Sequence, residues 1–342
     1  MDMFWAVVLS REKKMFLFKE ELIDYLQQED YTSLTSKADK IREQYLGNEV
    51  HLRALVEFSN VCRNNCLYCG IRRDNHKLSR YRLSQDDILD ITKSAVELGY
   101  KTIVLQSGED MYFDTLRLCH IIEEIKKYDV ALTLSIGERT YDEYKSFKIA
   151  GADRYLMRIE TTNKELYHKL NPNQSWDNRH KCLLQIKELG YELGSGIMVG
   201  LPNQTIESIA DDLLYLKELD VDMAGIGPFI PHPDTPLAKE KGGSFALALK
   251  TMALMRLLLE DINIPATTAM EALHPQGQII ALQSGANVIM PNLTLSSCRK
   301  LYSLYPNKEN TIQTKSELLK KLNSINRTVS KSYGNHKKIL TL

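Results

Sequence analysis

The feature that most constrains the fold is an alternation of short apolar or β-branched runs with longer segments of helical periodicity, which begins near residue 51. The strand candidates are residues 51–58, 101–107, 131–136, 154–160, 193–199, 223–229, 264–270 and 287–290. All but the last precede a helical segment, for example 84–98, 114–128, 205–219 and 244–259. Eight βα repeats over roughly 240 residues are typical of a (β/α)8 barrel of the TIM type, an α/β fold. A doubly wound open sheet is the weaker alternative.

Capping residues support these boundaries and suggest three regions. Ser84 with Asp87, and Thr205 with Ser208, stand where helix N-caps belong. We expect a helical extension at residues 1–48, the barrel at 49–306, and a short helix with a polar tail at 307–342.

The composition limits the partners. The chain has 342 residues with 44 Lys and Arg against 44 Asp and Glu, so its formal charge is zero. This balance argues against a general electrostatic partner such as nucleic acid or an anionic membrane. No run approaches the ~18 apolar residues of a membrane span. Six cysteines are too few for a disulfide scaffold in a chain of this length, which favours a reducing, cytoplasmic location.

The strongest local motif is C-x3-C-x2-C, formed by Cys62, Cys66 and Cys69 in the loop after the first strand. Three thiolates at this spacing can face one metal centre at the barrel mouth, where such folds keep their active sites. A 4Fe-4S cubane on three thiolates keeps one iron open for another ligand. A structural zinc would instead need a fourth protein ligand, and only His76 is close in sequence.

The motif, with an aromatic residue before its last cysteine, resembles the radical S-adenosylmethionine (SAM) superfamily. That resemblance implies two cofactors, a 4Fe-4S cluster and SAM. It also implies that SAM binds the open iron and is cleaved reductively to methionine and a 5′-deoxyadenosyl radical. The protein would then act mainly by positioning groups and excluding water.

Longer segments, at 56–62, 102–110, 225–233 and 265–270, resemble the HydE family of FeFe-hydrogenase maturases, and the likeness extends over residues 35–305. The resemblance implies a small organometallic substrate, an iron-cysteine complex carrying CO and cyanide. It also implies the sister maturases HydG and HydF as partners and an electron donor such as ferredoxin or flavodoxin.

Two other interpretations stay open, and a third is disfavoured. Methylornithine synthase shares the barrel and the motif, which would make the substrate amino-acid-like, and a non-catalytic metal scaffold would share the cysteines. Biotin synthase holds a second cluster inside its barrel. Here Cys119 and Cys182 fall in helical segments and Cys298 lies past the last strand, which disfavours such a cluster.

Polar residues occupy strand positions that a barrel normally fills with branched aliphatics. Period-two alternation places Arg154, Arg158 and Glu160 on one face of the fourth strand, and Arg53 faces the same way from the first. Burying such groups is costly unless they bind each other or a ligand. The sequence therefore predicts a polar cavity that suits an anionic substrate.

The family resemblance assigns roles to these and other positions. The predicted SAM-binding residues are Tyr68, Gln106, Ser107, Gly108, Ser135, Arg158, Glu160, Arg179, Met198 and Met223. The predicted substrate or anion residues are Arg53, Thr133, Arg154, Thr267, Thr268 and Tyr302. Simpler structural interpretations exist: an ion pair for Arg158 and Glu160, a turn for Gly108, core packing for the methionines, and strand propensity for the threonines.

Overall fold

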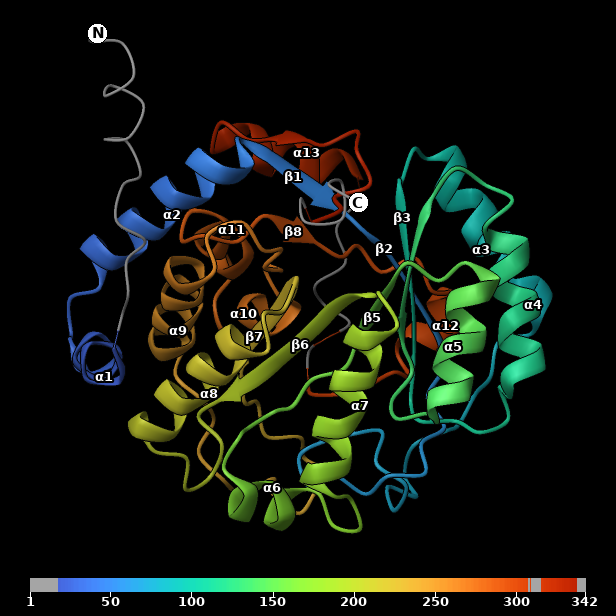
Figure 1. The fold of residues 1–342 in the computed structure, drawn as a ribbon, viewed down its shortest axis with the longest axis horizontal. Coiled ribbons are helices and arrows are strands. Elements are labelled where there is room, and N and C mark those ends of the chain that lie inside the picture. Colours follow the sequence, from blue (N-terminus) through green and yellow to red (C-terminus); the bar gives the residue numbers. More distant parts are fainter. Residues whose placement is uncertain (1–17, 307, 309–314, 337–342) are drawn as a thin grey trace, which may run out of the picture.

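The computed structural model describes residues 18–306, 308 and 315–336, and its centre is a ring of parallel strands (Figure 1). Six strands form one parallel sheet in sequential order: β2 (Ala54–Ser59), β3 (Thr102–Ser107), β4 (Ala131–Ser135), β5 (Arg154–Leu156), β6 (Glu192–Val199) and β7 (Met223–Pro228). A second parallel sheet has the order β8 (Val288–Ile289), β1 (Glu49–Leu52) and β9 (Thr328–Val329). The two sheets are parts of one barrel wall.

Backbone hydrogen bonds close the ring between the two sheets. The amide of Ala224 in β7 donates to the carbonyl of Asn263 (3.0 Å), and the segment after Asn263 pairs in turn with β8. On the other side, Arg53 N donates to Ile289 O and Leu55 N to Pro291 O, both at 2.9 Å. The predicted (β/α)8 barrel is therefore confirmed.

Helices surround the ring and follow the strands in order (Figure 1). They are α3 (Gln85–Glu97), α4 (Thr115–Ile125), α5 (Tyr141–Ala150), α6 (Lys164–Leu170), α7 (Trp176–Glu188), α8 (Ile206–Glu218), α9 (Phe245–Leu258), α10 (Thr268–Leu273), α11 (Gly277–Leu282) and α12 (Ser296–Arg299). The predicted caps are present: Ser84 accepts from the amide of Asp87, and Thr205 from that of Ser208. None of the described helices is long and apolar enough to cross a membrane.

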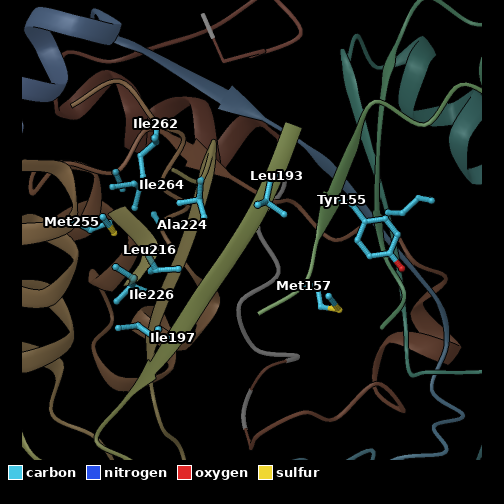
Figure 2. Packing of buried hydrophobic residues seen from close by; sticks show 14 of the residues in the cluster. Tyr155, Met157, Leu193, Ile197, Leu216, Ala224, Ile226, Met255, Ile262 and Ile264 are labelled. Carbon is cyan, nitrogen blue, oxygen red and sulfur yellow. The ribbon is translucent and has the colours of Figure 1, made fainter. Parts of the chain in front are cut away.

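Apolar side chains fill the space between the strands and the outer helices. Figure 2 shows Ala224 and Ile226 of β7 beside Leu216 of α8 and Met255 of α9. These residues are at most 1% exposed. Burial of a side chain the size of Leu or Ile contributes about 1.5–3 kcal/mol, so this layer holds the helices against the ring.

The predicted N-terminal extension packs on one side of the barrel. It consists of α1 (Lys19–Gln27), which contacts α8 and α9, and α2 (Thr32–Leu46), which lies along α9. The ammonium of Lys250 on α9 donates to the carbonyl of Gln28 at 2.8 Å, which ties the end of α1 to the barrel. Residues 1–17 of the predicted region lie outside the described residues.

Three predicted strands differ from the structure. The strand at 51–58 is interrupted at Arg53, which separates β1 from β2. The strand at 154–160 ends at Leu156, and Glu160, which has a left-handed backbone (φ 67°), meets β6 only through an isolated bridge to Ile197. In place of the strand at 264–270 there are isolated bridges at Asn263 and Pro265, and Thr267 occupies the N-cap position of α10.

The C-terminal segment is not the loose polar tail that the sequence predicts. After α13 (Lys315–Ser324), β9 pairs with β1, and residues 330–336 continue across the N-terminal ends of the barrel strands. The carbonyl of Gly334 accepts from Arg53 Nη2 (3.2 Å) and from Asn263 Nδ2 (3.0 Å). His336 is 1% exposed and lies between Asp222 and Asp261. This segment therefore covers the end of the barrel opposite the cysteine loop.

Candidate functional site

The cysteine loop joins β2 to α3 and is folded around two polar side chains. Asn60 is buried and donates to the carbonyls of Ser79 (2.9 Å) and Leu301 (2.8 Å), which pins the base of the loop. Arg80 donates to several backbone carbonyls within the loop, including that of Ile71 at 2.8 Å. Because a guanidinium carries five donors, one side chain can hold a whole irregular loop in shape.

The three motif cysteines are half-buried, and all three line one cavity. The amide of Cys69 donates to the carbonyl of Cys66 (3.2 Å), a turn that brings the two side chains to the same side. Cys62 Sγ accepts from the amide of Glu109 at 3.3 Å. Burial raises the pKa of all three thiols, that of Cys66 to about 11, so thiolates here require a positive centre beside them.

The cavity opens at the C-terminal ends of the strands and has a volume of about 390 Å³. Nine of the ten predicted SAM-binding residues line it: Tyr68, Gln106, Ser107, Gly108, Ser135, Arg158, Glu160, Arg179 and Met198. Three of the six predicted substrate residues also line it: Thr267, Thr268 and Tyr302. The structure thus brings nearly all of the first predicted set and half of the second to one place.

The end of β3 approaches the cysteine loop closely. A Cβ atom on Gly108 would lie 2.2 Å from the carbonyl oxygen of Val61 and 2.8 Å from Cβ of Cys62, so only glycine fits. The next residue, Glu109, accepts from Asn64 Nδ2 in the loop (3.0 Å) and from the amide of Glu138 after β4 (2.9 Å). These contacts fix the strand end, the loop and the neighbouring strand relative to one another.

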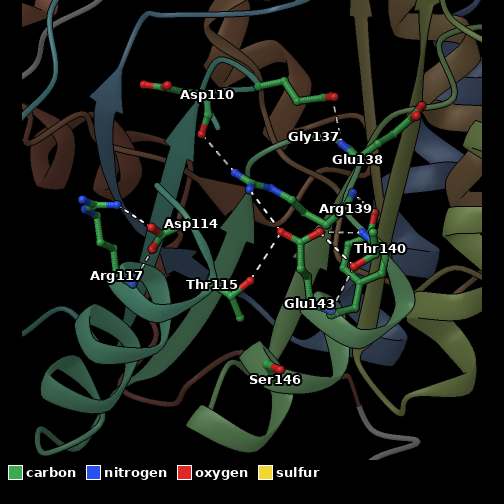
Figure 3. A network of polar contacts seen from close by, with 12 residues as sticks. Asp110, Asp114, Thr115, Arg117, Gly137, Glu138, Arg139, Thr140, Glu143 and Ser146 are labelled. Atoms are coloured by element: carbon green, nitrogen blue, oxygen red, sulfur yellow. Dashed lines mark hydrogen bonds and ion pairs between the residues drawn. The ribbon is translucent and has the colours of Figure 1, made fainter. Parts of the chain in front are cut away.

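A second polar network supports the same strand ends from outside (Figure 3). Arg139 donates to the carbonyl of Asp110 (3.1 Å) and pairs with Glu143 of α5 (3.5 Å). The carboxylate of Asp110 accepts from Ser59 Oγ at the end of β2 (2.7 Å) and from Arg82 at the end of the cysteine loop (2.7 Å). The positions of Ser107 and Gly108 therefore depend on contacts from three elements.

Arg158 and Glu160 lie in the irregular segment after β5. Their side chains form an ion pair at 3.1 Å, and the left-handed Glu160 pairs through its backbone with Gly196 and Met198 of β6. Burial raises the pKa of Glu160, against the opposing charges of Arg158 and Arg179. This strained backbone persists at the cavity wall, where strain commonly marks a ligand site.

The irregular segment after β5 is held in place by Asp212 of α8, which is fully buried. Asp212 Oδ1 accepts from the amide (2.5 Å) and hydroxyl (2.6 Å) of Thr162, and Oδ2 accepts from Gln204 (3.3 Å). Gln204 also donates to the carbonyl of Met198 at 3.0 Å. One carboxylate thus connects the segment after β5, which supplies Glu160, to the end of β6, which supplies Met198.

Four predicted site residues lie elsewhere in the barrel. Arg53, Thr133, Arg154 and Met223 do not line the cavity. Arg154 forms a buried ion pair with Glu192 at the start of β6 (2.8 Å), and Arg53 donates to the sulfur of Met223 (2.7 Å). Arg53, Arg154 and Met223 thus lie at the N-terminal ends of the strands, below the cavity. Thr133 is buried in the middle of β4.

A charged pair in the cavity wall is not among the predicted site residues. Glu57 of β2 is fully buried and binds Lys308, while Asn292 donates to its other oxygen at 2.7 Å. A glutamate inside an apolar strand was a usable signal. Lys308 gave no such signal, because it follows the barrel and lies 251 positions after Glu57 in the sequence.

The remaining candidate ligands are dispersed. Cys119, Cys182 and Cys298 lie on α4, α7 and α12 and do not line the cavity. His76, the one histidine near the motif in sequence, is exposed. Within residues 18–336 as far as they are described, no group of three His, Cys, Asp or Glu residues could hold a single metal ion.

Comparisons with known proteins identify the family. The model of the radical SAM superfamily matches residues 56–216. The FeFe hydrogenase maturase subunit HydE of Thermotoga maritima is 60% identical over 276 residues, which cover 81% of this chain and 79% of that protein. The chain belongs to the HydE family of the radical SAM superfamily.

More distant relatives share the fold. The 3-methylornithine synthase of Methanosarcina acetivorans is 32% identical over 78% of this chain and 76% of its own length. A crystal structure of methylornithine synthase matches with a TM-score of 0.83 and 26% identity over 92% of this chain and 95% of that one. Identity to HydE is thus nearly twice that to the first synthase and more than twice that to the solved one.

The cavity fits the cofactors that the radical SAM family implies, a 4Fe-4S cluster and SAM. Three thiols converge at its mouth. Arg158 Nε and Thr267 Oγ1, both in its wall, are buried and have no hydrogen-bond partner among the described residues. Buried polar atoms normally have hydrogen-bond partners, so these two atoms fit a polar ligand bound in the cavity.

Proposed function

We propose that this chain is a radical SAM enzyme that acts in maturation of the FeFe-hydrogenase H-cluster. The observation that carries the proposal is the 60% identity to HydE, set against 32% to 3-methylornithine synthase. The cavity geometry supports the same chemistry, since the cysteines, the strained Arg158–Glu160 segment and the Gly108 strand end all face it.

In this proposal Cys62, Cys66 and Cys69 would hold a 4Fe-4S cluster, with SAM bound beside it. The residues proposed to bind SAM are Tyr68, Gln106, Ser107, Gly108, Ser135, Arg158, Glu160, Arg179 and Met198. When bound, the two cofactors supply reductive cleavage of the sulfonium to methionine and a 5′-deoxyadenosyl radical.

The chain's own residues then orient the reactants and exclude water. Glu160 would accept and Arg158 would donate hydrogen bonds to polar groups of the cofactor, and their mutual ion pair orients both side chains beforehand. The cavity wall also contains Leu156, Met157 and Phe229, whose apolar surfaces keep solvent from a reactive centre.

The other part of the cavity suits a small anionic substrate. Thr267, Thr268 and Tyr302 present hydroxyls, and the Lys308 ammonium stands beside Glu57 in the same wall. Hydroxyl and ammonium donors match the nitrogen ends of cyanide ligands and a carboxylate, as in an iron-cysteine complex that carries CO and cyanide. We propose this complex as the substrate, with HydG as its source, HydF as a further partner, and ferredoxin or flavodoxin as the reductant.

The proposal is tested with anaerobically reconstituted protein. Reduced protein should release 5′-deoxyadenosine from SAM, and it should support maturation of an apo-hydrogenase in the presence of HydG and HydF. Release of 5′-deoxyadenosine together with methylornithine formation from lysine would instead favour the synthase function. Absence of any SAM cleavage would favour a metal-binding scaffold.

A further inference from the structure

One side chain outside the cysteine loop contacts a sulfur of the motif. Gln174, in the turn before α7, places Nε2 3.0 Å from Sγ of Cys66. Among the described residues it is the one side chain from outside the loop that donates to a motif sulfur; the donor at Cys62 is a backbone amide. Gln174 belongs neither to the cysteine motif nor to the predicted site residues.

The orientation of the Gln174 amide is fixed by a charge. Arg179 Nη2 donates to Gln174 Oε1 at 3.0 Å, and Arg179 is itself held by Glu138 at 2.8 Å. A guanidinium can only donate, so it selects the carbonyl end of the amide. The NH₂ end is left to face the sulfur.

The backbone conformation around Gln174 is also fixed by local contacts. Its amide donates to the carbonyl of Asn171 (3.1 Å), Asn173 adopts a left-handed conformation (φ 67°), and Ser175 caps α7. Gln174 lines both the main cavity and an outer cleft of about 400 Å³. The amide therefore stands in the wall between the motif sulfur and the surface.

We propose that Gln174 raises the reduction potential of the cluster through an N–H···S hydrogen bond to Cys66. Adding one electron increases the negative charge on the cysteine sulfurs, and a donor dipole stabilises the reduced state more than the oxidised state. A higher potential lets a weaker reductant deliver the electron. This inference rests on the proposed cluster, but it does not depend on which substrate the enzyme uses.

The test is a redox titration of the reconstituted cluster without SAM, followed by its electron paramagnetic resonance signal. Gln174→Leu removes the donor at nearly constant volume, and the equilibrium constant for reduction should fall threefold to tenfold. At 59 mV per tenfold for one electron, this is a shift of about 30–60 mV to lower potential. Gln185→Leu makes the same chemical change in α7 away from the cavity and should leave the potential unchanged.

A second variant keeps the test decisive if Gln174→Leu fails to retain the cluster. Gln174→Glu keeps the shape and the Arg179 contact but replaces the donor with a carboxylate, so the potential should fall at least as far. A potential equal to that of the wild type in a variant with full iron content would overturn the proposal. So would loss of iron from both variants, because the amide would then be needed for assembly. A wild-type protein that holds no cubane would instead refute the proposed function.

Discussion

Thr267 is a buried hydroxyl without a partner among the described residues, in the wall of the cavity. Replacing such a group by an isosteric methyl is close to neutral for folding, since no hydrogen bond is lost. We expect Thr267→Val to leave the thermal unfolding midpoint unchanged and to lower maturase activity about threefold to tenfold, the value of one hydrogen bond to a ligand. Thermal unfolding and an apo-hydrogenase maturation assay measure the two effects.

Thr294 provides the matched control. It is buried, and its hydroxyl accepts from the amide of Glu57 at 2.7 Å, so Thr294→Val should lower stability by about 1 kcal/mol. If Thr267→Val lowered stability as much as Thr294→Val and left activity intact, Thr267 would be a structural residue.

The cysteines divide into two groups by position. Replacing Cys62, Cys66 or Cys69 by Ala should abolish release of 5′-deoxyadenosine, because two thiolates cannot hold the cubane with its open iron. Replacing Cys119, Cys182 or Cys298 should leave release intact, since these thiols lie on three separate helices outside the cavity. Strong loss in any of the second three would contradict a single catalytic triad.

The sequence could predict which face of a strand a residue occupies, but not how deep in the barrel its side chain lies. Arg154 and Arg158 are four positions apart on one face, and alternation alone could not separate them. Arg158 lies beyond the end of β5 and reaches the cavity, whereas Arg154 begins β5 and pairs with Glu192. Position along the strand, and not the face, decides which arginine can meet a ligand.

At the scale of elements, local patterns failed where distant groups decide the structure. The adjacent threonines at 267–268 favoured a strand, but Thr267 is an N-cap and the helix-forming Ala269, Met270 and Glu271 follow. The stretch 330–336 is polar and has no periodicity. Its order comes from buried partners on distant strands, which no local pattern can show.

The same stretch should make stability depend on pH. Burial alone would lower the pKa of His336, but its bonds to Asp222 and Asp261 raise the pKa to about 9, against about 6.5 in an unfolded chain. The stabilisation is therefore complete below about pH 6.5 and is lost as the pH rises through about 9. It amounts to about 3 kcal/mol at most.

The thermal unfolding midpoint, measured from about pH 6 to about pH 9.5, tests this dependence. His336→Gln should flatten the decline at high pH, while His120→Gln, at an exposed position of α4, should leave it unchanged. An unaltered decline in His336→Gln would place the titrating group elsewhere.

At the scale of the whole molecule, the two ends of the barrel have different characters. The C-terminal end carries the cysteine loop and the open cavity, whereas the N-terminal end is closed by buried ion pairs and the 330–336 segment. The barrel and its loop were predictable because βα periodicity and the cysteine spacing are local patterns. The closure was not, because it joins residues such as Arg53 and Gly334 that are 281 positions apart.

The distribution of cysteines over the molecule predicts the number of clusters. Cys298 is the last cysteine in the sequence, and Cys119, Cys182 and Cys298 sit on separate elements. The two ring nitrogens of His336 contact the carboxylates of Asp222 and Asp261. Fully reconstituted protein should hold about four irons per chain. Reduction should produce a single spin system, and its signal should change when SAM is added. Iron and sulfide analysis that gave about six to eight irons, with a part removable while the first cluster stays, would require a second site that these cysteines do not provide.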